Sequence, residues 1–226
     1  MSNQAQAAMA QPESLAETLE EVLAGRRSIR RFSGDPVREE DIRRIVRAGG
    51  LAPSAGNQQM WRFLVVRSRA LIDQMHKAVL EAVEDVLSWE ESREYEGRIS
   101  GMRNGATFFA QAPVTIAVLS KAYDQPLDLH VLPARGYTFE QVYRLRGDPG
   151  RQSVGGAIQN MLLMAHALGY GACWMCGPLV AGPTLERLLK VEEPWRLVAL
   201  VPVGVPAQSP GVPKKKSQEE ISAFVD

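Results

Sequence analysis

Four short and largely apolar runs, separated by helical patterns, constrain the fold of this 226-residue chain most strongly. The runs lie at residues 62–67, 113–120, 172–176 and 195–204. Apolar runs of this length, bounded by polar segments, predict buried strands. The sequence therefore predicts a sheet surrounded by helices, in the order helix, helix, strand, helix, strand, helix, strand, helix, strand.

Apolar residues at helical spacing predict the five helices between these runs. They span residues 14–25, 36–50, 71–87, 153–168 and 183–189. The helix at 153–168 is apolar around most of its circumference, which indicates a central, buried position. Two segments are less regular. The polar stretch 88–104 is either the solvated end of a helix or a mobile lid, and residues 121–150 are expected to form a long irregular loop.

Composition and charge exclude several classes of protein. The chain has 45% hydrophobic and 23% charged residues and a formal net charge of zero, so no global field favours a nucleic acid or an anionic membrane. Residues 1–13 lack the basic start and apolar core of a signal peptide, so we expect a flexible tail and a cytoplasmic location. Residues 14–226 are expected to form a single domain with a proline-rich C-terminal arm at 206–226.

Two polar segments carry most of the chemistry. The first follows the first helix directly and contains Arg26, Arg27, Ser28, Arg30 and Arg31. Fixed guanidinium groups match the oxygens of a phosphate well. The second segment, residues 52–61, is rich in small and amide side chains, and could form a hydrogen-bonding wall for a flat heterocycle. Together they suit a phosphate-bearing aromatic cofactor, whereas the alternatives are a solvated basic surface and an ordinary turn.

The two cysteines, Cys173 and Cys176, form a C-x-x-C pair. Such a pair can be a thioredoxin-like redox couple or half of a zinc site. The zinc interpretation needs two further ligands, which the scattered His76, His130 and His166 do not supply as a pair. A redox pair is expected near the start of a βαβ unit rather than late in a chain. The favoured interpretation is two buried small side chains on a strand.

Familiar catalytic motifs are missing from the sequence. It contains no dinucleotide-binding glycine motif, phosphate-binding P-loop, nucleophile elbow or zinc-protease helix motif. A phosphate-binding segment without an evident acid, base or nucleophile suggests that a cofactor carries the reaction.

Five motifs, in their order along the chain, resemble those of the nitroreductase family of flavin mononucleotide (FMN) oxidoreductases. They are residues 26–32, 52–61, 157–163, 168–178 and 200–206 with the basic tail that follows. The resemblance covers about residues 14–224. It implies an α+β fold with a mixed sheet surrounded by helices. It also implies an intertwined homodimer whose extended C-terminal arm embraces the partner, with two FMN sites at the interface.

The resemblance assigns the arginine segment to the cofactor. In this family the R-x-S-x-R stretch binds the flavin. Arg26 and Arg30 are therefore expected at the phosphate and the pyrimidine edge, with Arg27 and Ser28 nearby.

The resemblance also brings in two further groups of residues. Pro53, Ser54 and Asn57 match residues that reach the flavin ring from the partner subunit. Cys176 and Gly177 fall where family members place backbone N–H groups at flavin N5, so that backbone rather than sulfur would matter there.

Two positions depart from the family pattern. Met60 stands where the family usually has proline before the tryptophan. The C-terminal phosphate ligand is commonly arginine, whereas this chain offers Lys214, Lys215 and Lys216, which supply charge without a bidentate fork. Which lysine serves is left open, and a solvated charge run is the alternative.

The resemblance implies an NAD(P)H-dependent FMN oxidoreductase with a ping-pong mechanism and no side-chain acid or base. NAD(P)H would reduce the flavin and leave, and a small electron-poor acceptor such as a nitroaromatic or a quinone would take its place. The alternatives are a dehalogenase, an enone reductase or a flavin-modifying enzyme of the same fold, and a flavin-binding protein without turnover. Segments 88–104 and 121–150 are expected to shape the acceptor pocket.

Overall fold

A four-stranded sheet forms the centre of the molecule, for which the computed structural model describes residues 13–225. The strands are β1 (Trp61–Val66), β2 (Val114–Ser120), β3 (Gly171–Ala172) and β4 (Arg196–Gly204), in the spatial order β1-β2-β4-β3. All three ladders are antiparallel. A parallel bridge between Ser28 and Ala172 adds the arginine segment beside β3. The predicted tail lies outside the described residues except for Glu13, which begins α2.

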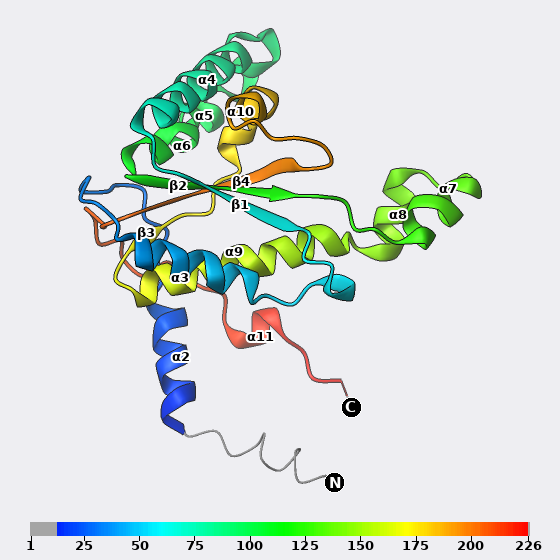
Figure 1. Ribbon diagram of the computed structural model, residues 1–226, viewed down its shortest axis with the longest axis horizontal. Helices are drawn as coiled ribbons and strands as arrows, with labels where there is room; N and C mark the ends of the chain where they lie inside the picture. Colours follow the sequence, from blue (N-terminus) through cyan, green and yellow to red (C-terminus); the bar gives the residue numbers. More distant parts are fainter. Residues whose placement is uncertain (1–12, 226) are drawn as a thin grey trace.

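Helices cover both faces of the sheet (Figure 1). On one face lie α4 (Arg69–Ser88), α6 (Met102–Thr107) and α10 (Gly182–Leu188), and on the other lie α3 (Glu39–Gly50) and α9 (Pro149–Ala167). Alternate residues of β2 pack into two hydrophobic cores, one on each face of the sheet. Ala117 and Leu119 pack on the side of α4, α6 and α10, and Ile116 and Val118 pack on the side of α3 and α9. This period of two follows from strand geometry. The predicted α+β class is confirmed.

The helices α3 and α9 cross closely at a glycine. A Cβ atom at Gly49 would lie 2.9 Å from Met161 Cγ and 3.1 Å from Phe63 Cζ. A larger residue there would push the two helices apart. This contact keeps α9 against the sheet as the buried central helix that the sequence predicts, with Ile158 and Met161 almost fully buried.

The prediction of an irregular loop over residues 121–150 is wrong, because this segment contains helices. They are η4 (Leu127–Val131), α7 (Leu132–Ala134) and α8 (Phe139–Arg146). A capping box begins α8: the Thr138 hydroxyl accepts from Gln141 N, and the Gln141 side chain accepts from Thr138 N. Together these helices project from one end of the sheet (Figure 1).

The remaining short elements join the main layers. They are η1 (Ala55–Asn57), η2 (Glu90–Tyr95), α5 (Glu96–Ile99), η3 (Phe108–Gln111) and η5 (Gly177–Ala181). The polar stretch 88–104 thus consists mainly of short helical turns. Its end is fixed to α4 by an ion pair between Arg103 and Glu84. Arg103 is the principal cause of a lowered pKa of Glu84. No helix in the described part of the chain is long and apolar enough to cross a membrane.

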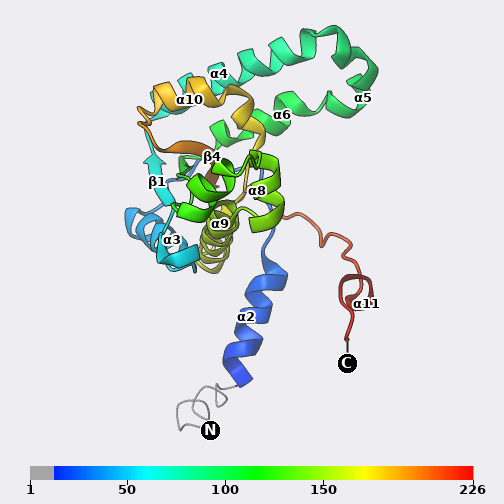
Figure 2. The same ribbon diagram turned by 90° about the vertical axis from the view of Figure 1, so that its right-hand side faces the viewer.

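Two terminal elements extend away from this body. Helix α2 (Glu13–Gly25) and the C-terminal segment with α11 (Gln218–Ile221) project on the same side of the molecule (Figure 2). Leu15, Leu19 and Leu23 lie on α2 and are each about half exposed. The helix therefore has an apolar stripe with little contact to its own chain.

Candidate functional site

The arginine segment lies between β3 and the start of the C-terminal segment. Ile29 N donates to Ala172 O at 3.1 Å, and Ala207 N donates to Arg31 O at 3.0 Å. These backbone bonds hold the segment in an extended form beside the sheet. They also bring residues 26–31 next to the beginning of the predicted arm.

The guanidinium groups of this segment differ in their availability. In the described part of the chain, Arg26 and Arg30 form no ion pair and donate no side-chain hydrogen bond. Arg27 instead donates to the carbonyl oxygens of Ala24 and Arg26 at the end of α2. Its Nε is buried without a hydrogen-bond acceptor among the described residues. Arg26 and Arg30 are thus free to bind an anion, whereas Arg27 is partly committed to the helix end.

The Cys173 thiol lies behind this positive segment. Burial raises the pKa of Cys173, and the charges of Arg30 and Arg26 and a hydrogen bond with Ser28 act in the opposite direction. Cys173 is 5% exposed, whereas Cys176 is exposed, and both are free thiols. The expectation that both cysteines are buried on a strand at 172–176 is therefore wrong for Cys176, because β3 ends at Ala172 and Cys176 lies in the turn before η5.

The turn at Cys176 and Gly177 follows the same strand. Met175 exchanges both backbone hydrogen bonds with Leu200, each at 2.9 Å, and η5 begins two residues later. In the described part of the chain, the N–H groups of Cys176 and Gly177 take no part in the backbone bonds that form this turn. A Cβ at Gly177 would lie 3.3 Å from Ala106 Cα on α6. Helix α6 thus backs the turn at close range.

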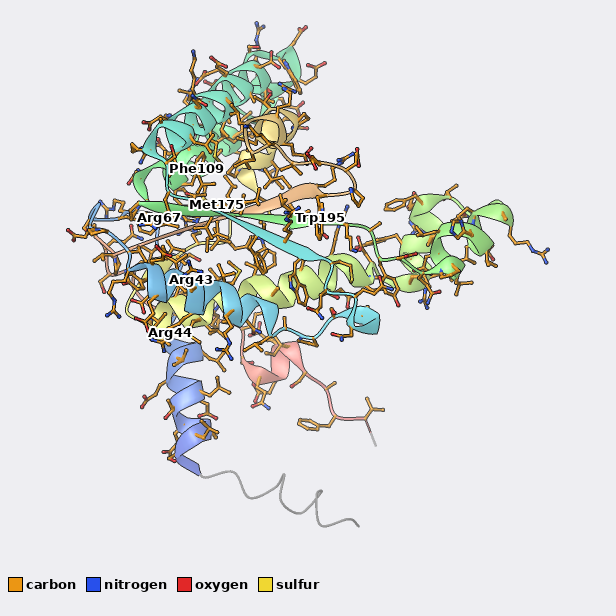
Figure 3. All side chains as sticks on the ribbon, viewed as in Figure 1. Arg43, Arg44, Arg67, Phe109, Met175 and Trp195 are labelled. Atoms are coloured by element: carbon orange, nitrogen blue, oxygen red, sulfur yellow. The ribbon has the colours of Figure 1, made fainter. Side chains whose placement is uncertain are left out.

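Figure 3 shows the surroundings of this turn. Met175 lies near Phe109 on the α4 side of the sheet, and both side chains belong to the same buried cluster. The strand that leads to Cys176 is therefore anchored in the core, and its backbone is held rigidly.

The loop with Pro53, Ser54 and Asn57 lies at the N-terminal end of α9. Ala55 N donates to the hydroxyl of Ser153 at 3.2 Å, and Ser54 Oγ accepts from Gln59 N at 2.9 Å. Asn57 has a φ of 54°, in the left-handed region, which asparagine tolerates better than most residues.

The arginine segment lies at the opposite end of α9. A Cβ at Gly25 would lie 2.7 Å from Nε2 of His166, in the last turn of α9. From Ser153 to His166 the helix rises by roughly 20 Å, at about 1.5 Å a residue. The structure therefore does not bring Ser54 or Asn57 to Arg26 and Arg30 within one chain.

Lys214, Lys215 and Lys216 are exposed on the C-terminal segment, before α11. They form no ion pair with any residue of the described part of the chain. The structure does not bring them to the arginine segment by any direct contact.

An ion-pair cluster fixes the approach to β3. The buried carboxylate of Asp41 on α3 accepts from Arg38 Nε at 2.7 Å and from the Tyr170 hydroxyl at 2.9 Å. Its hydrogen bond with Arg38 is the main cause of a lowered pKa of Asp41, against the effect of burial. Because Tyr170 directly precedes β3, the cluster ties α3 to the strand that pairs with the arginine segment.

The sequence reasoning missed Gln58. Its side-chain Nε2 donates to Asp124 O at 2.7 Å, and its Oε1 accepts from Asp124 N at 2.9 Å. These two bonds join the 53–57 loop to the segment that carries α7 and α8. No sequence pattern pointed to this pair, since a glutamine in a loop is ordinary. Ala106 was also missed, because only the fold brings it to Gly177.

Comparison with known proteins identifies the family. A sequence model of the nitroreductase family matches residues 23–205. The chain is 30% identical to an iodotyrosine deiodinase of Nematostella vectensis, over 87% of this chain and 70% of that protein. It is 29% identical to a 5,6-dimethylbenzimidazole synthase of Rhodospirillum rubrum, over 89% of this chain and 88% of that protein.

The structural comparisons agree. A BluB-like flavoprotein of Clostridium difficile 630 is 30% identical and superimposes with a TM-score of 0.80, covering 92% of this chain and 99% of its own. A nitroreductase with bound FMN from Desulfitobacterium hafniense DCB-2 has the same fold, with a TM-score of 0.68 at 22% identity over 92% of this chain and 98% of its own. The chain belongs to the nitroreductase family.

Proposed function

We propose that this protein is an FMN-dependent oxidoreductase that takes electrons from NAD(P)H and passes them to a small electron-poor acceptor. One observation carries the proposal. The bridge from Ser28 to Ala172 sets two free guanidinium groups beside the strand that leads to the turn at Cys176 and Gly177. From residue 172 to residue 176 the chain can span at most about 14 Å. The arrangement therefore offers an anion-binding end and a backbone donor end, as an elongated phosphate cofactor requires.

The donor set fits FMN. The arginines and the Ser28 hydroxyl can donate to a phosphate that carries nearly two negative charges. The N–H groups of Cys176 and Gly177 can donate to acceptor atoms on the flavin ring. These groups are donors, and no carboxylate pairs with Arg26 or Arg30 in the described part of the chain.

Bound FMN would supply the chemistry of hydride acceptance and electron donation. The residues of this chain then bind FMN, orient it and stabilise its reduced form. Arg26 and Arg30 hold the phosphate and pyrimidine ends, and their positive charge favours an anionic reduced ring. The backbone N–H groups of Cys176 and Gly177 hold the reactive edge of the ring, and α6 supports this turn from behind. No side-chain acid or base is needed, which agrees with a ping-pong order of NAD(P)H and acceptor at one slot.

We further propose that the functional form is a homodimer. Because Ser54 and Asn57 lie about 20 Å along α9 from the arginine segment, a second copy is needed to bring such a loop to the same cofactor. The half-exposed leucines of α2 offer an apolar surface for that copy. Pro53, Ser54 and Asn57 then contribute to the partner's flavin site.

The C-terminal arm is proposed to embrace the partner along β1. An open groove of about 520 Å³ lies between α3 and this edge strand and is lined by Ile42, Arg43, Val46, Arg47, Val65 and Arg67, with Glu39. Figure 3 shows Arg43 and Arg44 on α3 and Arg67 at the end of β1. The arm carries complementary groups: acidic Glu219 and Glu220, and exposed Ile221 and Phe224. Lys214, Lys215 and Lys216 precede them and are proposed to supply charge near a phosphate.

The acceptor is proposed to be a nitroaromatic or a quinone. The 88–104 segment leads into α6, which contacts Gly177, so this segment is suited to shape the acceptor slot. Reductive dehalogenation of a halogenated aromatic is the second candidate, because the chain is 30% identical to an iodotyrosine deiodinase. Assays with a nitroaromatic, a quinone and iodotyrosine under NAD(P)H separate these activities.

The decisive experiment compares two double variants. Arg26→Ala/Arg30→Ala removes two charge-assisted contacts worth about 1.5–3 kcal/mol each, so FMN affinity should fall by at least about 100-fold. Arg98→Ala/Arg135→Ala removes two other exposed arginines and should leave affinity unchanged. Flavin absorbance after gel filtration and equilibrium titration measure both. Full flavin occupancy in the first variant would refute the phosphate assignment, and wild-type protein that binds no FMN would refute the proposed function.

A further inference from the structure

Trp174 presents an open aromatic face next to the proposed flavin edge. Its side chain is 42% exposed, although its neighbours Cys173 and Met175 are only 5% and 3% exposed. Cys176, two residues further on, is exposed as well. β3 ends at Ala172, and the exposed Trp174 and Cys176 flank the buried Met175, whose backbone pairs with Leu200, so both exposed side chains lie beside this anchored residue.

A glycine on α9 supports the back of the indole. A Cβ built at Gly155 would lie 3.4 Å from Cη2 of Trp174. Gly155 lies well inside α9, where glycine is about 0.5–1 kcal/mol less stable than alanine. A methyl group there would be in ordinary van der Waals contact with the ring, so the edge of the indole lies close against the helix while much of its surface stays open. The indole is thus held from behind, although it is a large apolar group in contact with solvent.

We propose that the Trp174 indole is a stacking platform for the flavin ring. The inference rests on the proposed function and adds a residue that the family motifs did not assign. Two residues of chain span at most about 7 Å, so Trp174 lies within that reach of Cys176. A ring system of three fused rings whose reactive edge meets the N–H groups at Cys176 and Gly177 therefore extends over the neighbouring exposed side chain. Offset stacking of two flat aromatic systems is the arrangement that their quadrupoles favour.

The test uses two substitutions that separate stacking from apolar packing. Trp174→Phe keeps a flat ring, whereas Trp174→Leu keeps apolar bulk without one. Purified apo-protein is titrated with FMN, and the dissociation constant, the tryptophan emission and the visible flavin spectrum are recorded. Trp195→Leu is the matched control, since Trp195 is partly exposed, precedes β4 and lies outside the segments assigned to the cofactor or the acceptor. Circular dichroism confirms that each variant is folded.

Stacking predicts an effect that depends on the ring. Trp174→Leu should raise the dissociation constant of FMN by about 10-fold and remove the change in flavin spectrum on binding, while Trp174→Phe stays within about 3-fold of wild type. Trp195→Leu should bind as wild type. If Trp174→Leu and Trp174→Phe bind FMN equally, or if Trp174→Leu matches wild type, the platform is refuted.

The failure of this inference is distinguishable from failure of the proposed function. If the wild type and Trp174→Leu bind FMN equally well and Arg26→Ala/Arg30→Ala does not bind it, the cofactor site is supported and only the platform is refuted. Wild-type protein that binds no FMN refutes both.

Discussion

Gly171 is the position where one added methyl group should damage the arginine segment most directly. A Cβ at Gly171 would lie 2.7 Å from three atoms of Ile29, including its own Cβ. Ordinary contacts of a Cβ begin near 3.4 Å, so the two segments would have to separate by about 0.7 Å. Ile29 is 7% exposed and branched at Cβ, so it cannot relieve the overlap by rotating a distant atom.

The expected cost of Gly171→Ala is that of an overpacked core, about 1–3 kcal/mol. In a domain of this size each kcal/mol lowers Tm by about 2–4 °C, so a midrange cost of about 2 kcal/mol lowers it by about 4–8 °C. Because Ile29 lies between Ser28 and Arg30, the same displacement should move the proposed phosphate ligands and weaken FMN binding by about 10-fold.

Gly182→Ala is the matched control for this change. Gly182 begins α10, has an ordinary helical conformation, and a Cβ there would meet no atom within 4 Å. Its effect on unfolding should stay within about 0.5 kcal/mol. Scanning calorimetry of the apo-protein and FMN titration measure both variants. If Gly171→Ala and Gly182→Ala have the same Tm and the same affinity for FMN, the pairing of Ile29 with β3 is wrong.

Three further predictions concern charge, thiols and assembly. The pKa of Asp41 is lowered in the folded protein, so its ionised form stabilises the fold above its unfolded-state pKa, near 3.8, and this contribution is lost as pH falls through the lower folded-state pKa. The variant Asp41→Asn should therefore lose less stability than the wild type as the pH is lowered through this range. An equal loss of stability in both proteins would contradict the assignment. Cys173→Ala/Cys176→Ala should keep most activity in an NAD(P)H-oxidation assay, because only the backbone at Cys176 is assigned to the flavin. Complete loss of activity in a folded variant would instead support the redox-pair alternative. Deleting residues 211–226 keeps the Ala207–Arg31 bond but removes most of the arm. Light scattering should then show monomers with poor flavin binding, whereas an intact holo-dimer would refute the role of residues 211–226 in assembly.

The sequence predicted the strands and long helices well for a physical reason. The runs 62–67 and 113–120 are apolar, and the structure has strands at Trp61–Val66 and Val114–Ser120. Of these two strands, only β2 is buried along its whole length, because β1 is an edge strand on which Val65 is exposed. The strand expected at 172–176 is limited to Gly171–Ala172. Helix α8 was missed even though Thr138 and Gln141 form a capping box, because the prolines and glycines around it suggested a loop. The strand order was beyond sequence reasoning, since the placement of β4 between β2 and β3 depends on long-range pairing.

The residues of the candidate site could be proposed from the sequence, but their layout could not. The arginine segment and the turn at Cys176 and Gly177 were recognised as separate motifs, and only the bridge at Ser28 joins them. The open indole of Trp174 was hidden within an apolar run, because exposure on such a short strand depends on which face the core covers. Likewise, Gly155 looked like an ordinary break in an apolar helix until its contact with that ring was seen.

Helix α9 keeps the two proposed parts of the flavin site apart within one chain. Its N-terminal end holds the 53–57 loop through Ser153, and its C-terminal end abuts Gly25, where the arginine segment begins. The helix is buried and rigid, so no loop movement within one chain can close a gap of about 20 Å. A second copy related by a two-fold axis can place each loop against the other chain's arginine segment, and two equivalent sites then form together. The exposed leucines of α2 and the apolar residues of the arm lie on elements that extend away from this body, where such a copy would cover them.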